Sequence, residues 1–423
     1  LRYNSFTMAE EIITGLDIGS STIRVVVGQV VPDETGKPQL HITGAVSVPS
    51  EGVHKGTVSS MEDAVSSVSK ALERAERMTG VAVNGAWVSI AGHNIFVQES
   101  HGVVGIARAD TDIREEDVER VIEAARTVAT PSNFEILHVI PKSFTVDGQH
   151  GIKDPVGMSG IRLEVDAVII QTLSSQIKNL TKTIYRTGLD IDDLVFTPLA
   201  TAEAVLTQRQ KELGVCVIDI GASSTSMVVF EEGDILHTAV LPVGGDHLTN
   251  DIAIGLRTSL EVAEKVKREF GNAVPDDVDR KAQFSLADFG STEDEMIKVR
   301  FVSEIIEARI EELFENIDDE LRKVDRSGML PVGVVLTGAT MHLPGVADVS
   351  KRVLRLPSTI GKPIGVTSVI DEVQDSAYAT AVGLTLWGFA IRGAHGGKFN
   401  LLNIKGVNQV ADQLRKWMKS LIP

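Results

Sequence analysis

Two short segments of the chain combine a carboxylate, a glycine and hydroxyl side chains in the same order. The tripeptide Asp-Ile-Gly occurs at 17–19 and again at 219–221, and each copy lies between two apolar runs. Glycine lets the backbone approach a ligand closely, successive backbone N–H groups can point at one anion, and hydroxyl groups add donors. These residue types predict two turns that bind phosphate oxygens. The residues expected to contact phosphate are Gly19, Ser20, Ser21 and Thr22 in the first turn and Gly221, Ala222, Ser223 and Ser224 in the second.

The aspartate of each turn has a different predicted role. A carboxylate beside a polyphosphate is repulsive unless a divalent cation lies between them. We therefore expect Asp17 and Asp219 to hold a hydrated Mg²⁺. One Asp-x-Gly alone is ordinarily a junction between a strand and a turn, so this prediction depends on the duplication.

A third glycine-containing turn follows the apolar run 332–336. Its residues Gly338 and Ala339 are predicted to let the backbone approach an adenosine. In the helical pattern of 260–270, Glu264 and Lys267 share one face because they are three residues apart. They could bracket a ribose and a base, and the alternative is an ordinary solvated ion pair.

The elements around each phosphate turn follow one plan. Apolar runs predict strands at 12–17, 23–31 and 39–48, and a helix follows at 62–78. A second set of three strands is predicted at 215–219, 225–230 and 235–241. We therefore expect an α/β fold with two duplicated halves. The first half is assigned residues 8–84, 169–197 and about 370–391, and the second half 198–244 and 299–369.

Two segments interrupt this plan. Residues 85–168 are interpreted as an inserted small α+β subdomain, with strands near 86–91 and 136–141 and a helix near 115–128. Residues 245–298 are interpreted as a subdomain of the second half, which a long amphipathic helix from 299 to 324 connects back to the core.

Composition limits the possible partners and setting. The chain has 423 residues, too many for one core, and its net charge of −17 argues against general binding of nucleic acid. The single cysteine, Cys216, lies in an apolar strand and is expected to be a buried apolar residue in a reducing cytoplasm. The apolar run 382–391 is too short to span a bilayer.

The end of the chain has a different character. Residues 392–405 are predicted to form a flexible linker, and 406–423 an amphipathic helix with a basic polar face. Tryptophan and flanking lysines favour a helix that lies in a membrane surface over one docked on the protein's own core or on a partner protein. The residues expected to contact lipid are Val410, Leu414, Arg415, Lys416, Trp417, Met418, Lys419 and Leu421.

Together these features resemble the superfamily of actin, hexokinase and the heat-shock chaperones. Three of them are similar to FtsA, the bacterial actin-like family of cell division, and the resemblance extends from about Ile12 to the end of the chain. The matching segments are His138-Val139-Ile140-Pro141 with 151–160 in the insertion, the connecting helices 198–206 and 379–384, and the linker with its basic amphipathic helix.

The resemblance implies actin-like, ribonuclease-H-type halves around a nucleotide cleft that binds ATP and Mg²⁺. It also implies self-assembly into filaments and a peripheral position on the cytoplasmic face of the cell membrane at the division site. There the protein would tether the ring of the tubulin-like protein FtsZ and bind other division proteins through the inserted subdomain. Any ATPase would be weak, with Glu203 as the residue that orients water, and Arg300 and Arg309 are candidates for binding the acidic C-terminal peptide of FtsZ.

Two positions depart from the family pattern. Ala222 and Ala339 stand where the family typically has glycine, and a Cβ in a backbone of positive φ would cost about 1 kcal/mol. We therefore expect altered nucleotide affinity or slow hydrolysis at the second turn.

Three rival functions share parts of the pattern. A PilM-like cytoplasmic scaffold of pilus assembly has similar Asp-Ile-Gly turns but not the 151–160 block or the tail. A small-molecule kinase of the same superfamily would need a catalytic base in a substrate cleft and has no use for such a tail. A peptide-binding chaperone would need a larger domain than the segment after Ile391.

Overall fold

The first half of the molecule is built on a six-stranded sheet. The computed structural model describes residues 11–394 except 93, 109, 128–129 and 292–294. Strands β1, β2 and β3 are antiparallel neighbours, while β6 and β11 extend the sheet parallel to β1. The sheet order is β11 (Asp190–Phe196), β6 (Gly85–Ile90), β1 (Ile12–Ile18), β2 (Thr22–Pro32), β3 (Pro38–Pro49) and β19 (Thr367–Ser368).

The second half repeats this plan with five strands. Three antiparallel strands again precede two parallel ones, and the order is β14 (Asp234–Leu241), β13 (Thr225–Glu231), β12 (Val215–Ile220), β17 (Gly333–Thr337) and β18 (Ser358–Ile360). Strand β12 therefore takes the place of β1, and each of them ends in an Asp-Ile-Gly turn. The predicted duplication of an α/β unit is confirmed.

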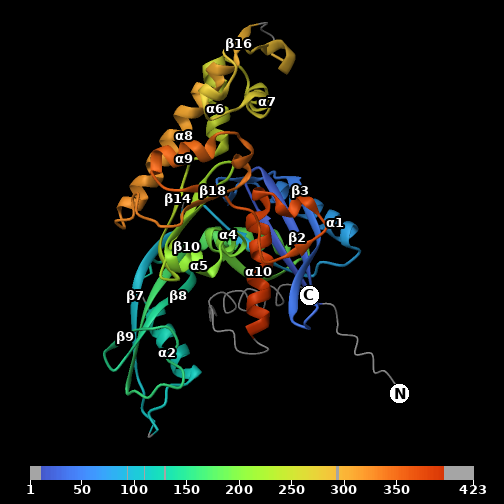
Figure 1. Cartoon of the computed structure of the whole chain (residues 1–423). Helices are drawn as coiled ribbons and strands as arrows, with labels where there is room; N and C mark the ends of the chain where they lie inside the picture. Colours follow the sequence, from blue (N-terminus) through green and yellow to red (C-terminus); the bar gives the residue numbers. More distant parts are fainter. Residues whose placement is uncertain (1–10, 93, 109, 128–129, 292–294, 395–423) are drawn as a thin grey trace.

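Two helices cross between the halves. Helix α4 (Thr197–Val205) leads from the first half into the second, and α10 (Ala379–Ala394) packs on strands of the first sheet and on α4 (Figure 1). A Cβ on Gly383 would lie 1.8 Å from the carbonyl oxygen of Ala200, so only glycine permits this close crossing. The hydroxyl groups of Thr201 and Thr380 are 2.9 Å apart at the same place.

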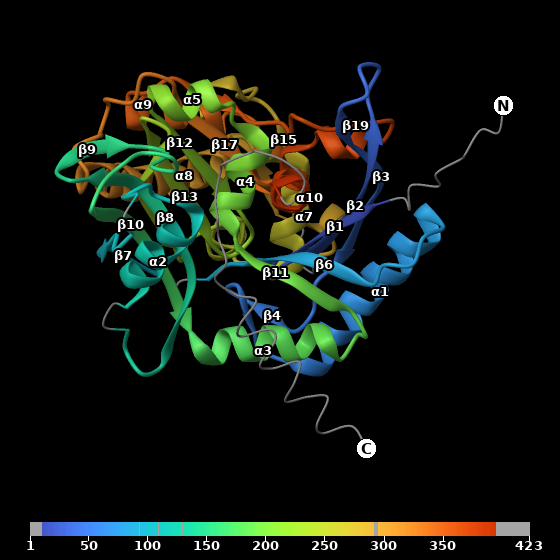
Figure 2. The same ribbon diagram turned by 90° about the horizontal axis from the view of Figure 1, so that it is seen from below.

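The opposite face of the first sheet is covered by α1 (Met61–Thr79) and α3 (Ser174–Tyr185), which contact each other (Figure 2). Apolar residues at helical spacing bury one side of α1, as its sequence predicts. The short strands β4 (Val53–His54) and β5 (Thr57–Val58) form a hairpin in the segment between β3 and α1.

The inserted subdomain is a four-stranded antiparallel sheet with one helix packed on it. Its strand order is β7 (Phe96–Gly105), β10 (Arg162–Leu173), β8 (Phe134–Val146) and β9 (Gln149–Ile152), and α2 (Glu115–Arg126) covers β7 and β10. The predicted start of this subdomain at residue 85 is too early, since β6 belongs to the first half's sheet. The short apolar run of β6 resembled the strands predicted inside the subdomain, so the sequence pattern alone did not separate them.

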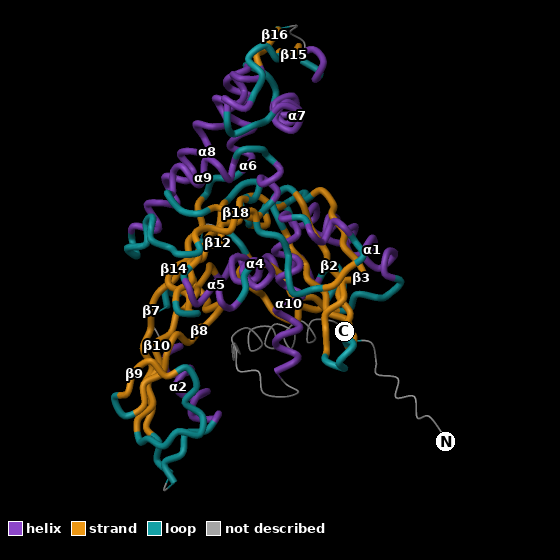
Figure 3. Tube along the Cα trace, viewed as in Figure 1, coloured by secondary structure: helices purple, strands orange, loops and turns teal. Residues whose placement is uncertain are grey.

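The second half carries a mostly helical subdomain at the far end of the molecule (Figure 3). It contains α6 (Gly245–Leu256), α7 (Leu260–Phe270), the strand pair β15 (Gln283–Ser285) and β16 (Met296–Lys298), and the long α8 (Val299–Arg322). Rings of Phe270, Phe284 and Phe289 pack together there. Helices α5 (Gln208–Leu213) and α9 (Val346–Leu354) complete the second half, and single 3₁₀ turns lie at 275–277, 286–289, 339–342, 371–374 and 376–378.

In the described part of the chain, no helix is long and apolar enough to cross a membrane. The predicted linker 392–405 lies outside the described residues apart from its first three, which belong to α10. The predicted amphipathic helix 406–423 and all its lipid-facing residues lie outside them as well.

Candidate functional site

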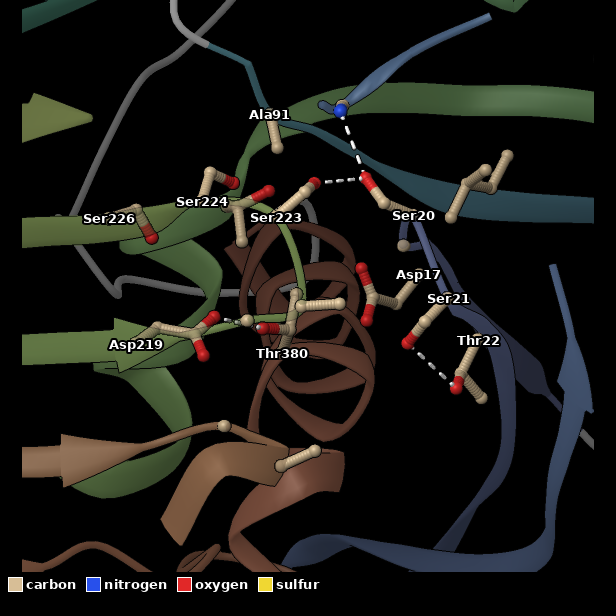
Figure 4. A pocket seen from close by; sticks show the side chains of 18 of the residues that line it. Asp17, Ser20, Ser21, Thr22, Ala91, Asp219, Ser223, Ser224, Ser226 and Thr380 are labelled. Carbon is tan, nitrogen blue, oxygen red and sulfur yellow. Dashed lines mark hydrogen bonds between the residues drawn. The ribbon is translucent and has the colours of Figure 1, made fainter. Parts of the chain in front are cut away.

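The two Asp-Ile-Gly turns face each other across one cleft (Figure 4). The cleft encloses about 790 Å³, open solvent at its mouth included. It is lined by residues from both halves and from α4 and α10. The predicted residues among them are Asp17, Gly19, Ser20, Ser21, Thr22, Asp219, Gly221, Ala222, Ser223, Ser224, Gly338 and Ala339.

Both turns are closed in the same way. The N–H of Gly19 donates to the carbonyl oxygen of Thr22 at 3.1 Å, and the N–H of Gly221 donates to that of Ser224 at 3.0 Å. A Cβ on Gly19 would lie 2.7 Å from the Thr22 oxygen. Among the described residues, no hydrogen bond occupies the backbone N–H groups of Ser20, Ser21, Ala222 and Ser223. These groups are available to bind an anion, as the turn chemistry predicts.

The carboxyl groups of Asp17 and Asp219 are held by hydroxyl groups. Ser89 donates to Asp17 at 2.8 Å, and Thr380 donates to Asp219 at 3.3 Å. Burial raises the pKa of Asp17, and burial together with the Asp17 charge raises the pKa of Asp219 to about 6. Within the described residues neither carboxyl belongs to an ion pair. Two desolvated carboxyls that repel each other make a site where a divalent cation is stabilised.

Arg24 lies beside this pair, and the sequence analysis missed it. It is directly opposite Asp17 in the β1–β2 ladder, so both side chains project from the same face of the sheet. Its guanidinium carbon is 5.5 Å from the centre of the Tyr378 ring, and its Nε is buried with no partner among the described residues. A cation among the apolar residues of β2, immediately after the turn, was the available signal. Arg24 can offer its guanidinium to a phosphate.

The second turn is fixed by the start of α6. The N–H groups of Gly245 and Asp246 donate to the carbonyl oxygens of Gly221 and Ala222 at 2.9 and 2.7 Å. A Cβ on Gly244 would lie 2.6 Å from the Gly221 oxygen, so this contact requires glycine. The Gly-Gly pair before a helical pattern could have revealed this support from sequence.

The two alanines that depart from the family pattern create no backbone strain. Positive φ occurs in this region at Gly338, where it is +93°, and neither Ala222 nor Ala339 has positive φ. The expected penalty of a Cβ in a left-handed backbone is therefore wrong at both positions. Gly338 itself must be glycine, because a Cβ there would lie 2.4 Å from the Ile220 oxygen and 2.5 Å from Asp219 Oδ1.

Glu264 and Lys267 lie behind the start of α6 and are not among the cleft-lining residues. Lys267 donates to the Gly245 carbonyl at 3.1 Å and to the Thr249 hydroxyl at 2.6 Å, and it pairs with Glu264 at 2.6 Å. In the described structure they therefore support α6, and contact with a ribose or base stays a prediction.

The remaining described candidates lie away from the cleft. Glu203, on α4, is paired with Lys211 and is not a lining residue, so its predicted role in orienting water has no geometric support; Thr197 and Pro198 are the residues of α4 that line the cleft. Arg300 is paired with Asp276 and Glu304 at 3.0 and 3.1 Å. Arg309 binds Asp251 with two nitrogen atoms.

The donor set fits a shared cation better than a site made by protein alone. The described residues contain no group of three or more His, Cys, Asp and Glu side chains that could hold a metal. Mg²⁺ is commonly bound by one or two carboxylates together with phosphate oxygens and water. Among the described residues, two aspartates, a guanidinium whose buried Nε has no hydrogen-bond partner, and four unoccupied N–H groups match that requirement.

Comparisons with known proteins give one family. The family model described as "Cell division protein FtsA" matches residues 216–383, and that of the "SHS2 domain inserted in FTSA" matches 92–171. The chain is 36% identical to cell division protein FtsA of Pseudomonas aeruginosa over 378 residues, 89% of either chain. It is 39% identical to FtsA of Bacillus subtilis over 386 residues, 91% of this chain and 84% of the relative. FtsA of Escherichia coli strain K12 is 34% identical over 385 residues, 89% of this chain and 90% of the relative.

Solved structures share the actin-like fold. A chain of the PilM–PilN type IV pilus biogenesis complex has a TM-score of 0.61 at 19% identity, covering 89% of this chain and 98% of its own. MreB5 of Spiroplasma citri bound to ADP has a TM-score of 0.53 at 12% identity, covering 92% and 99%. At these identities the likeness concerns the fold alone.

Proposed function

Because the chain belongs to the FtsA family of cell-division proteins, we propose that it binds Mg-ATP in its cleft, self-associates, and tethers the FtsZ ring to the cytoplasmic face of the membrane at the division site. The observation that carries the nucleotide part is the pair of facing turns, with Asp17 and Asp219 both desolvated and, beside them, Arg24, whose buried Nε has no hydrogen-bond partner in the described part of the chain. Without a cation and a phosphate these groups are in unfavourable surroundings.

Each of these groups would contact a different part of the bound Mg-ATP. The N–H groups of Ser20, Ser21, Ala222 and Ser223 bind phosphate oxygens, Arg24 offsets their charge, and the two aspartates orient water molecules on the metal. Bound Mg-ATP would supply a bridge between the two halves. Solved MreB5 chains of the same fold are bound to ADP and to AMPPNP, which supports a nucleotide in this position.

The described residues contain no carboxylate placed as a general base other than the two metal aspartates. Glu203 is held by Lys211 outside the cleft. We therefore assign the nucleotide chiefly the role of holding the two halves together, with at most weak hydrolysis. Self-association through actin-like contacts then depends on the closed arrangement of the halves.

The membrane and partner roles are supported by the sequence and the family. The basic amphipathic pattern of 406–423 supports binding to an anionic lipid surface. Arg300 and Arg309 are both proposed to bind an acidic FtsZ peptide, which would displace the carboxylates of Asp276 and Glu304 from Arg300 and those of Asp251 and Glu312 from Arg309. The inserted subdomain presents its own surface for other division proteins.

One experiment tests these parts together. The purified full chain is sedimented with vesicles of anionic and zwitterionic lipid, with and without Mg-ATP, and with a fluorescent FtsZ tail peptide. We expect the protein in the pellet with the vesicles, more of it with Mg-ATP, and the peptide to follow. Protein that stays in the supernatant with lipid would contradict the tether, and an unchanged distribution on adding Mg-ATP would contradict nucleotide-dependent assembly.

A further inference from the structure

The chain enters and leaves the inserted subdomain at two neighbouring points, and one buried side chain joins them. The segment after β6 leaves the first sheet at Ala91, and β10 returns at Thr172 just before α3. Gln176, in the first turn of α3, has only 7% of its surface exposed. Its Nε2 donates to the Ala91 carbonyl, and its Oε1 accepts from the Thr172 hydroxyl at 3.0 Å.

The same amide reaches toward the cleft. Gln176 Nε2 also donates to the carbonyl oxygen of Gly56 at 3.2 Å, and the N–H of Gly56 donates to Ser20 Oγ at 3.1 Å. Ser223 Oγ donates to the same Ser20 oxygen at 2.7 Å (Figure 4). One chain of hydrogen bonds therefore runs from the two connections of the inserted subdomain, through Gln176 and Gly56, to both phosphate turns.

The backbone packs closely along this series of hydrogen bonds. Gly56 has φ of +73°, and a Cβ there would lie 2.9 Å from the N atom of Gly92. Gly92 has φ of +125°, and a Cβ there would lie 2.8 Å from Gln176 Nε2. Gln176 also borders a small void lined by Val53, Gly56 and Leu180. The contacts on one side are tight while space remains on the other, so a shift of Gly56 can move the Gln176 amide.

The hydrogen bond between Ser20 and Ser223 is incompatible with a phosphate between them. At 2.7 Å the two hydroxyl oxygens leave no room for a phosphate oxygen that both turns would bind. Binding must break this bond and change what Ser20 offers to the N–H of Gly56. The Gly56 N–H then either moves with Ser20 or loses its acceptor. Losing the acceptor costs free energy, because the donor is partly buried.

From these contacts we propose that Gln176 is a positioning residue that couples the occupancy of the cleft to the placement of the inserted subdomain on the first half. This inference deepens the proposed function, since it requires a nucleotide or another polyphosphate in the cleft. The subdomain would take one arrangement while Ser20 and Ser223 are bonded and a second when a phosphate separates them. The cleft then controls the surface that the inserted subdomain presents to partner proteins or to a second copy of the chain.

The test is a distance measurement between the subdomain and the first half. Spin labels are placed on cysteines introduced at Val103 on β7 and Met78 on α1, both exposed, while the single native cysteine, Cys216, is fully buried. Mg-ATP should shift the distance distribution in the parent protein. Gln176→Leu should lose the shift while calorimetry still detects Mg-ATP binding, and Thr172→Val should reduce it. Thr183→Val is the matched control, because Thr183 is also buried on α3 and, among the described residues, its hydroxyl bonds only the Asn179 carbonyl.

The outcomes separate this inference from the proposed function. A shift that persists in Gln176→Leu, or one that Thr183→Val also removes, overturns the coupling. Absence of Mg-ATP binding in the parent protein by calorimetry overturns the proposed nucleotide function instead. The coupling is then judged without nucleotide from Ser20→Ala, which removes the bonds of Ser20 Oγ to Gly56 and to Ser223. An altered distance distribution supports the coupling, and an unchanged one overturns it.

Discussion

The two cleft aspartates carry the pH dependence of the site. Burial first, and the Asp17 charge second, raise the folded-state pKa of Asp219 from its ordinary value of 3.8 to about 6. An acid whose pKa is raised by folding binds its proton more tightly in the folded state. The free energy of unfolding of the ligand-free protein is therefore lowered as pH rises through the window from about 4 to about 6, where this carboxyl loses its proton.

Asp219→Asn tests this assignment. The variant carries no titrating carboxyl at this position, so its stability relative to the parent protein should increase as pH rises from 4 to 7, measured by urea denaturation. The same substitution should weaken Mg-ATP binding at pH 7, measured by calorimetry.

In the parent protein the dissociation constant for Mg-ATP should increase below pH 6, by about tenfold per pH unit, because a proton competes with the metal. Asp371→Asn, at an exposed carboxyl outside the cleft, is the control, and equal affinities of the three proteins would contradict a metal at Asp219.

Arg24 is the second residue whose role can be measured. Arg24→Ala should reduce Mg-ATP affinity by about tenfold or more, since a hydrogen bond to a charged group contributes about 1.5–3 kcal/mol. The Mg-ATP affinity of Arg24→Lys should lie between those of the parent protein and Arg24→Ala, because lysine keeps the charge and lacks the planar guanidinium. Arg74→Ala is the control, since within the described structure the Arg74 guanidinium on α1 bonds only the Ser47 carbonyl, at 3.5 Å. An Arg24→Ala protein with parent affinity would show that phosphate does not reach this guanidinium.

The sequence predicted those residues whose chemistry is local. A strand, an aspartate, a glycine and hydroxyls in succession form a complete turn, so both cleft turns were predictable. Arg24 was missed because its role depends on cross-strand pairing with Asp17, and Gly244 because its role depends on how the start of α6 packs on the second turn; neither contact is specified by the local pattern of residues. Glu264 and Lys267 were placed on one helix face correctly, but the sequence did not indicate that Thr249 and Gly245 occupy them.

At the scale of elements, the crossing of α4 and α10 determines how closely the two halves approach. The helices meet at Gly383 and Ala200, and Thr380 links this crossing to Asp219. The resemblance to the family implied both helices but not this contact, because the helical state of a segment does not specify what the segment packs against. Likewise, a short apolar run predicted strand β6 without assigning it to the first sheet, which placed the predicted subdomain boundary too early.

Gly383→Ala measures the tightness of the crossing. Alanine is favoured over glycine inside a helix by about 1 kcal/mol. The added Cβ would nevertheless lie 1.8 Å from the Ala200 carbonyl oxygen, and overpacking of this kind costs about 1–3 kcal/mol. We expect a net loss of stability in urea denaturation together with weaker Mg-ATP binding, because the halves are forced apart. Gly105→Ala is the control, since nothing lies within 4 Å of its added Cβ. A stabilised Gly383→Ala protein would mean that helix propensity outweighs the contact.

At the scale of the whole molecule, charge is divided unevenly along the chain. The net charge is −17, while the predicted C-terminal helix carries Arg415, Lys416 and Lys419. An anionic membrane therefore repels most of the protein and attracts this end. Each basic residue near anionic lipid contributes about 1 kcal/mol, so one helix binds reversibly. Several helices joined in one assembly bind much more firmly through their high effective concentration.

Trp417→Asp distinguishes insertion of the apolar face from attraction by charge alone. The substitution places a carboxylate on the face predicted to enter the lipid, and vesicle sedimentation should fall nearly to the level of a protein truncated after Ile391. Asn408→Asp adds the same charge on the predicted polar face, opposite Trp417, because nine residues are about two and a half turns of helix. If the apolar face enters the membrane, the control variant should lose only the lipid attraction that corresponds to one charge. Added salt should weaken its vesicle binding further, because salt screens the attraction between basic residues and anionic lipid. Equal losses in both variants would mean that the end of the chain is held at the lipid surface by electrostatics without insertion.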